Sequence, residues 1–134
     1  MDDIIYLDHH STTPLDERVL NKMIPFFMND YGNPSNIDNI YGNLALKATN
    51  ESRELITTLL GAKNPREIIF TSGATESNNL ALIGLYNKYG SKRKHIISTR
   101  IEHKSVLNTL IYLQSQGAEV SLLNVDRYGR IDID

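Results

Sequence analysis

The stretch Glu67–Asn79, with the sequence EIIFTSGATESNN, decides how this chain of 134 residues folds. Its first half, Glu67–Thr71, is apolar and rich in β-branched residues, which predicts a strand. Small and hydroxyl residues follow, and then a helical pattern begins. A helix that starts directly after a strand leaves its first backbone N–H groups without partners inside the helix. The stretch therefore predicts a strand, a loop and a helix whose N-terminus can bind a phosphate or carboxylate.

The loop Ser72–Thr75 has the composition of an anion site. Gly73 and Ala74 allow an anion to approach the backbone closely, and the hydroxyl groups of Ser72 and Thr75 can add hydrogen bonds. Neither the dinucleotide fingerprint G-x-G-x-x-G nor the P-loop pattern is present, so NAD and Walker-type nucleotides are not indicated. The alternative is that Ser72 or Thr75 merely caps the helix, and hydroxyl residues do this more often than they bind cofactors.

Composition and charge narrow the classes of protein that fit. With 40% hydrophobic and 22% charged residues, the chain has the composition of a globular domain or part of one. A net charge of −2 gives no reason to expect direct nucleic-acid binding or a membrane surface as partner. Cysteine is absent, which excludes disulfides, thiolate metal sites and a cysteine nucleophile within this sequence. No apolar run approaches the length of a signal or membrane helix, so a cytoplasmic location is expected.

Two helices are predicted before this stretch, after an extended N-terminal arm. The first begins after the N-cap residue Asp16 and places five apolar residues on one face: Val19, Leu20, Met23, Ile24 and Phe27. The second runs from about Gly42 to Leu60, and Gly61 is expected to be its C-cap. Between them lies the polar loop Gly32–Asn36, which is expected at the surface and suits a binding contact.

Helices and strands are predicted to alternate after the stretch, in the order helix Glu76–Tyr89, strand His95–Thr99, helix Lys104–Gln116 and strand Glu119–Leu123. This alternation indicates an α/β fold with a parallel sheet. Ligands in such sheets bind beyond the carboxyl ends of the strands. The candidates at that edge are the loop Ser72–Thr75 and His103. A turn at Asp126–Arg130 follows, and the last residues are expected to start a further helix.

Five segments in this order resemble the cysteine desulfurases, which are pyridoxal-phosphate (PLP) enzymes of the aminotransferase class V group. They are YLDHHSTTP (6–14), YGNPSN (31–36), EIIFTSGATESNNLA (67–81), HIIST with IEHKSVL (95–107), and a strand followed by D-x-x-G-x-I-D (126–132). The resemblance implies the large domain of a fold-type I transferase, present in part. Residues 1–40 would be the arm, first helix and active-site-mouth loop, and residues 41–134 the start of the PLP-binding domain.

The resemblance also implies roles for four residues. Ala74 and Thr75 would bind the cofactor phosphate, and His103 would stack on the pyridine ring and help proton movement at the substrate carbon. Imidazole suits both tasks because it is planar and titrates near neutral pH. Without the resemblance, His103 at a helix start is more simply a surface or capping residue. Asn33 would orient a substrate carboxylate, although Asn before Pro is equally a turn former.

The activity implied is release of sulfur from L-cysteine, giving alanine and an enzyme persulfide, for iron–sulfur cluster assembly or tRNA thiolation. The complete enzyme would be a homodimer that passes sulfur to a scaffold or another acceptor protein. The family's Schiff-base lysine, acidic partner of the pyridine nitrogen and catalytic cysteine have no counterparts here. The chain is therefore expected to be an N-terminal portion, from a truncated or split gene, that is inactive alone.

Three alternatives remain open from the sequence. The first is that the chain is a non-catalytic remnant that associates with a full-length desulfurase or scaffold. The second is that it is part of another class V enzyme such as a selenocysteine lyase, and the third that it is part of a kynureninase-like or aminotransferase-like protein. A metal site is not expected, because His9 and His10 are adjacent and no H-E-x-x-H motif occurs.

Overall fold

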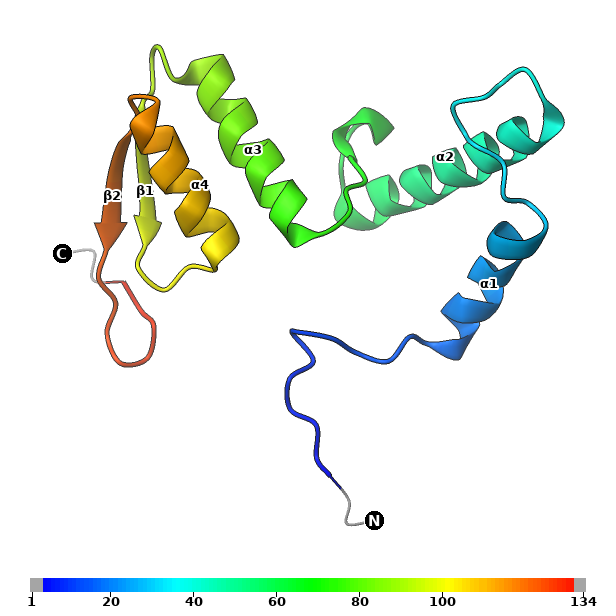
Figure 1. Cartoon of the computed structure of the whole chain (residues 1–134), viewed down its shortest axis with the longest axis horizontal. Helices are drawn as coiled ribbons and strands as arrows, with labels where there is room; N and C mark the ends of the chain where they lie inside the picture. Colours follow the sequence, from blue (N-terminus) through cyan, green and yellow to red (C-terminus); the bar gives the residue numbers. More distant parts are fainter. Residues whose placement is uncertain (1–3, 132–134) are drawn as a thin grey trace. The chain divides into compact units, whose positions relative to one another are not determined.

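The computed structural model describes residues 4–131 and divides into two compact units, Met1–Ile69 and Phe70–Asp134 (Figure 1). The first unit contains helices α1 (Glu17–Met28) and α2 (Ile40–Leu60) and the short 3-10 helix η1 (Pro65–Glu67). The second contains α3 (Ala74–Tyr89), β1 (His95–Thr99), α4 (Lys104–Ser115) and β2 (Glu119–Leu123). The predicted division of the family's domain at residues 40 and 41 stays a prediction.

Local capping residues set the ends of the helices in the first unit, as predicted. The Asp16 carboxylate accepts a hydrogen bond from the backbone nitrogen of Arg18 at 2.8 Å, which satisfies one of the free amides at the start of α1. Helix α2 ends at Gly61, whose φ of 66° lies in the left-handed region that glycine adopts without strain.

Glycine also permits a close approach between the loop at residues 32–36 and the start of α2. A Cβ atom at Gly42 would lie 1.7 Å from the backbone oxygen of Asn36, and one at Gly32 would lie 2.2 Å from the backbone of Tyr41. Gly42 is buried. The predicted surface loop is thus held against α2 by backbone contacts that leave no room for a side chain.

The second unit is a small α/β layer (Figure 1). Strands β1 and β2 pair in parallel, with His95 opposite Glu119 and Thr99 opposite Leu123. Helix α4 connects them and packs against both β2 and α3. Leu110 and Leu113 of α4, exposed by 2% and 1%, form the core together with Ala118. The α/β class and both of these strands are confirmed.

The strand predicted at Glu67–Thr71 is wrong. Glu67 ends η1, and the apolar residues that follow form no strand, with Ile69 and Phe70 both exposed. An apolar run becomes a strand only when another backbone pairs with it, and in the described residues the sheet consists of β1 and β2 alone. Helix α3 also starts two residues earlier than predicted, at Ala74.

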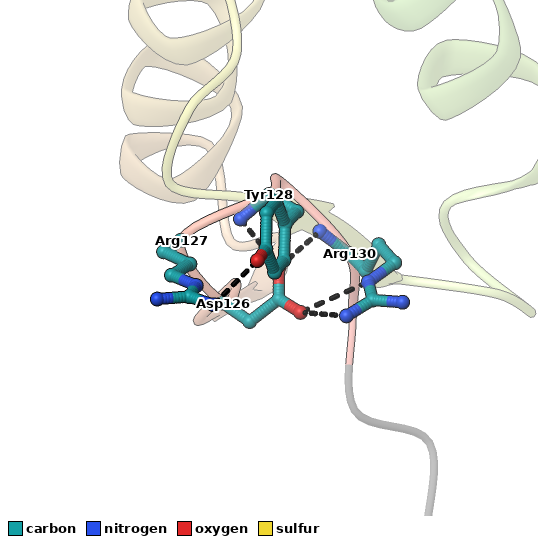
Figure 2. A network of polar contacts seen from close by, with 4 residues as sticks. All are labelled: Asp126, Arg127, Tyr128 and Arg130. Carbon is teal, nitrogen blue, oxygen red and sulfur yellow. Dashed lines mark hydrogen bonds and ion pairs between the residues drawn. The ribbon is translucent and has the colours of Figure 1, made fainter.

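The turn after β2 is held by the Asp126 carboxylate (Figure 2). Its Oδ1 accepts from the backbone nitrogens of Tyr128 and Arg130 at 2.8 and 3.0 Å, and its Oδ2 pairs with the Arg130 guanidinium at 2.9 Å. Gly129 supplies the positive φ of 79° that the turn needs. The predicted turn is confirmed. Of the helix expected to start at Ile131–Asp134, only Ile131 lies within the described residues, where it forms an isolated bridge with Val125.

Large apolar side chains remain at the surface of the second unit. Leu85, Ile97 and Ile111 are exposed by 58%, 63% and 66%. No helix within residues 4–131 combines the length and the apolar character of a membrane span. The three exposed side chains lie on α3, β1 and α4, and neither of these helices is a candidate membrane span.

We predict that Gly42→Ala destabilises the chain and that Gly84→Ala does not. A Cβ at Gly42 must displace the loop backbone, and overpacking of this kind costs about 1–3 kcal/mol. A Cβ at Gly84, inside α3, meets no atom within 4 Å, so alanine there should stabilise by about 0.5–1 kcal/mol. Urea unfolding followed by circular dichroism measures both, and equal stability of the two variants would contradict the close approach.

Candidate functional site

Side chains from the first turn of α3 form hydrogen bonds that hold the residues just before this helix. Gly73 is the N-cap residue and provides no side-chain hydrogen bond. Instead, Glu76 Oε2 accepts from the backbone nitrogen and the hydroxyl of Ser72, each at 2.7 Å, and Ser77 Oγ lies 2.7 Å from Thr71 Oγ1. The alternative that Ser72 or Thr75 caps this helix is therefore wrong.

This arrangement leaves backbone donors free at the predicted anion site. Within residues 4–131, no group accepts a hydrogen bond from the amides of Ala74 or Thr75, and the Thr75 hydroxyl is likewise unengaged. A Cβ at Gly73 would meet no atom within 4 Å, so the N-cap position beside these amides is uncrowded. Free amides at a helix N-terminus, together with the helix dipole, favour an anion.

His103 is the N-cap residue of α4 and follows the carboxyl end of β1 by four residues. Its Nδ1 lies 3.1 Å from the backbone nitrogen and 2.9 Å from the hydroxyl oxygen of Ser105. The ring itself is exposed. The capping interpretation is thus confirmed, and within the described residues it leaves the Nε2 atom of His103 without a hydrogen-bond partner.

Thr75 and His103 line the same cavity, which has a volume of about 550 Å³. We call it the Thr75–His103 cavity, and it lies between α3 and α4. Its walls consist of residues at helical spacing on the facing sides of the two helices: Thr75, Asn79 and Ile83 from α3, with Lys104, Ser105, Asn108, Thr109 and Tyr112 from α4 beside His103. The volume is within the range of small-molecule sites.

A polar network joins the two helices at this cavity. Asn79 Nδ2 donates to the Thr75 carbonyl at 2.8 Å, and Asn79 Oδ1 accepts from the Thr109 hydroxyl at 2.6 Å. Thr109, exposed by only 4%, also lies 2.8 Å from the Ser105 carbonyl. Sequence reasoning missed Asn79 and Thr109, although their spacing of four residues from Thr75 and Ser105 is the signal that could have found them.

Asn33 belongs to the first unit, where it forms a turn. Its Oδ1 accepts from the backbone nitrogen of Ser35 at 2.9 Å, and its carbonyl accepts from the backbone nitrogen of Asn36 at 2.9 Å. The turn-forming interpretation is confirmed, and the substrate-binding role of Asn33 stays a prediction. No group of three or more metal-ligating side chains gathers anywhere in the described part of the chain.

We predict that the Glu76 carboxyl titrates below its ordinary range. The Ser72 backbone N–H, and then the Ser72 hydroxyl, lower the pKa of Glu76 by hydrogen bonding to the carboxylate. Since this pKa is lower in the folded than in the unfolded chain, the bonds stabilise folding above the ordinary glutamate range, and that contribution is lost as the pH falls through the lowered pKa. NMR of the carboxyl carbon gives the titration midpoint directly.

Ser72→Ala should raise that midpoint while leaving it below the ordinary value, because the backbone donor remains. Ser77→Ala is the matched control, since it removes a hydroxyl of the same loop that does not contact Glu76. A midpoint that is the same in the wild-type chain and Ser72→Ala would contradict the hydroxyl contribution.

Comparison with known proteins places this chain in a family. Residues 5–134 match the aminotransferase class-V family. The mitochondrial cysteine desulfurase of Drosophila melanogaster is 47% identical over 129 residues, covering 96% of this chain and 28% of that protein. A solved NifS-like protein matches with a TM-score of 0.87 and 40% identity over 96% of this chain and 35% of its own. A structure described as SspA in complex with cysteine matches with a TM-score of 0.78 and 44% identity over 87% of this chain and 33% of its own.

The chain therefore spans about a quarter to a third of the length of the relatives it matches. The expected resemblance to the N-terminal portion of the cysteine desulfurases is confirmed, and so is the fold class, because the solved relatives share it at 40% identity or more. PLP is the cofactor of this family. The chain belongs to the aminotransferase class-V family.

Proposed function

We propose that this chain supplies the phosphate-binding and ring-covering residues of a PLP-dependent cysteine desulfurase. The observation that carries the proposal is that Thr75 and His103, from different helices, line one cavity. PLP, when bound, supplies an electron sink for bond cleavage at the carbon atoms of an amino acid. The residues of this chain bind and orient that group.

The free groups at the start of α3 fit the phosphate. The amides of Ala74 and Thr75 and the Thr75 hydroxyl are three donors without acceptors in the described chain. The helix dipole adds about 0.3–1 kcal/mol for an anion at an exposed site. The Lys104 side chain lines the same cavity and adds positive charge. These donors offset the nearby carboxylate of Glu76, whose Oε2 is engaged by Ser72.

The exposed imidazole of His103 fits the aromatic ring. Two hydrogen bonds to Nδ1 hold the imidazole in place, so little side-chain entropy is lost when a planar ligand stacks on it. The network through Asn79 and Thr109 fixes the position of α4 relative to α3. The hydrogen-bond donors of Ala74 and Thr75 and the imidazole ring of His103 are therefore held in place before any ligand binds.

The remaining chemical groups of the reaction must come from other polypeptide segments. The sequence contains no cysteine, so it has no thiol that can carry a persulfide. Among the described residues that line the cavity, Lys104 is the one lysine, and it is adjacent to His103. The relatives are about three times as long as this chain. L-Cysteine as substrate is supported by the solved relative described with cysteine.

The same proposal has three further parts: homodimerisation of the complete enzyme, sulfur transfer to an iron–sulfur scaffold or other acceptor, and a cytoplasmic location. The relatives include a protein named as mitochondrial, so location has to be measured for this chain separately. Fractionation of cells that express the tagged chain gives that location.

Reconstitution tests the function. We expect that mixing this chain with a polypeptide carrying the remaining family segments produces visible PLP absorbance and cysteine-dependent sulfide release. Thr75→Ala should weaken PLP binding about 10- to 100-fold, because a hydrogen bond to a charged group contributes about 1.5–3 kcal/mol. Absorbance titration with PLP measures the affinity.

Lys104→Arg is the control for adventitious reaction of PLP with the cavity lysine. It keeps the positive charge and removes the primary amine, so absorbance and sulfide release should persist in the mixture. Absence of both signals on mixing, with both polypeptides folded by circular dichroism, would contradict the proposal.

A second function, from a different class, is favoured by the exposed apolar side chains of Leu85, Ile97 and Ile111. These side chains suit a non-catalytic role in which the chain binds a full-length desulfurase or a scaffold. We expect a pull-down with a full-length desulfurase to retain the chain, and Ile111→Glu to lose it, under this second function. Lack of association with the wild-type chain would remove this alternative.

A further inference from the structure

The hydrogen bonds around His103 assign the position of its ring proton. Nδ1 lies 3.1 Å from the backbone nitrogen of Ser105. A backbone N–H can only donate, so Nδ1 must supply a lone pair. A neutral imidazole that accepts at Nδ1 carries its hydrogen on Nε2.

The Ser105 side chain reinforces the same assignment. Asn78 Nδ2 donates to Ser105 Oγ at 2.8 Å, which occupies a lone pair of the hydroxyl oxygen. The Ser105 hydroxyl hydrogen is then directed to His103 Nδ1, at an oxygen–nitrogen distance of 2.9 Å. Ser105 is exposed by only 7%, so water competes little for these bonds. The bonds run in one direction, from Asn78 through Ser105 to His103.

We propose that Ser105, supported by Asn78, is a positioning residue that keeps His103 in the tautomer with hydrogen on Nε2. His103 Nε2 has no protein partner in the described part of the chain. The ring therefore presents a hydrogen-bond donor, and no lone pair, to a ligand in the Thr75–His103 cavity. The identity of that ligand rests on the proposed function, whereas the tautomer does not.

This assignment narrows what His103 does in the family's chemistry. To take up a proton as a general base, the ring needs a free nitrogen lone pair, and the lone pair of Nδ1 is already bound by two donors of Ser105. Stacking and hydrogen-bond donation from Nε2 require no change in these bonds. The geometry favours the latter two roles over proton abstraction.

Ring-nitrogen NMR shifts of His103 in the full chain test the proposal without any cofactor. At a pH where the ring is neutral, the wild-type chain should give one protonated-type signal for Nε2 and one unprotonated-type signal for Nδ1. Ser105→Ala removes the hydroxyl donor and Asn78→Asp turns that hydroxyl towards a carboxylate. The Ser105 backbone N–H still donates to Nδ1 in both variants, so the two signals should move only part of the way towards each other, as the second tautomer becomes partly populated.

Ser105→Thr keeps a hydroxyl at the same position and should retain the wild-type shifts. Ser115→Ala and Asn87→Ala are matched controls that remove the same groups from exposed positions of α4 and α3, and both should match the wild-type chain. A wild-type signal showing hydrogen on Nδ1 would overturn the proposal, as would unchanged shifts in folded Ser105→Ala. Failure of PLP binding with the Nε2 tautomer intact would instead overturn only the proposed function.

Discussion

The hydrogen bonds between α3 and α4 are the constraint on which the candidate site depends. The buried hydroxyl of Thr109 has one hydrogen, and two acceptors lie within 2.8 Å of its oxygen, Asn79 Oδ1 and the Ser105 carbonyl. Asn79 in turn donates to the Thr75 carbonyl. Loss of the Thr109 hydroxyl leaves Asn79 Oδ1 without this donor, and an unsatisfied buried acceptor costs about 1–3 kcal/mol. The network therefore fixes the start of one helix relative to the start of the other.

Much of the fold was predictable because its signals are local. The N-cap Asp16, the C-cap Gly61 and the alternating segments from His95 to Leu123 each act through neighbouring residues. The structure of Glu67–Thr71 was not predictable from its local pattern. That pattern indicated a strand, but a strand also depends on a partner backbone elsewhere in the chain. Its absence leaves Ile69 and Phe70 exposed.

The site was predictable in part. Thr75 and His103 were found because each was expected to follow a strand of a parallel sheet. In the described residues only His103 does so, after β1, and Thr75 reaches the same cavity through the packing of α3 on α4. The residues that join them were missed, since Asn79 and Thr109 are 30 positions apart and neither is unusual in a helix. Glu76 was missed as well. Its carboxylate binds the Ser72 amide and hydroxyl, while the amides of Ala74 and Thr75 have no acceptor in the described residues.

The same features explain how a portion of a family domain can already contain an ordered candidate site. The donors of α3 and the imidazole of α4 lie within one unit, and their supporting bonds come from the same two helices. Under the proposed function, the groups that bind and cover the cofactor would be separated along the sequence from the groups that react with it.

The most direct measurement is an NMR titration of the wild-type chain with PLP, following the amides of Ala74 and Thr75 together with the ring of His103. If one cavity binds both ends of the ligand, these signals shift with a single midpoint, and inorganic phosphate shifts the two amides while leaving the ring unchanged. Separate midpoints, or a response at only one of the two helices, would contradict a shared site.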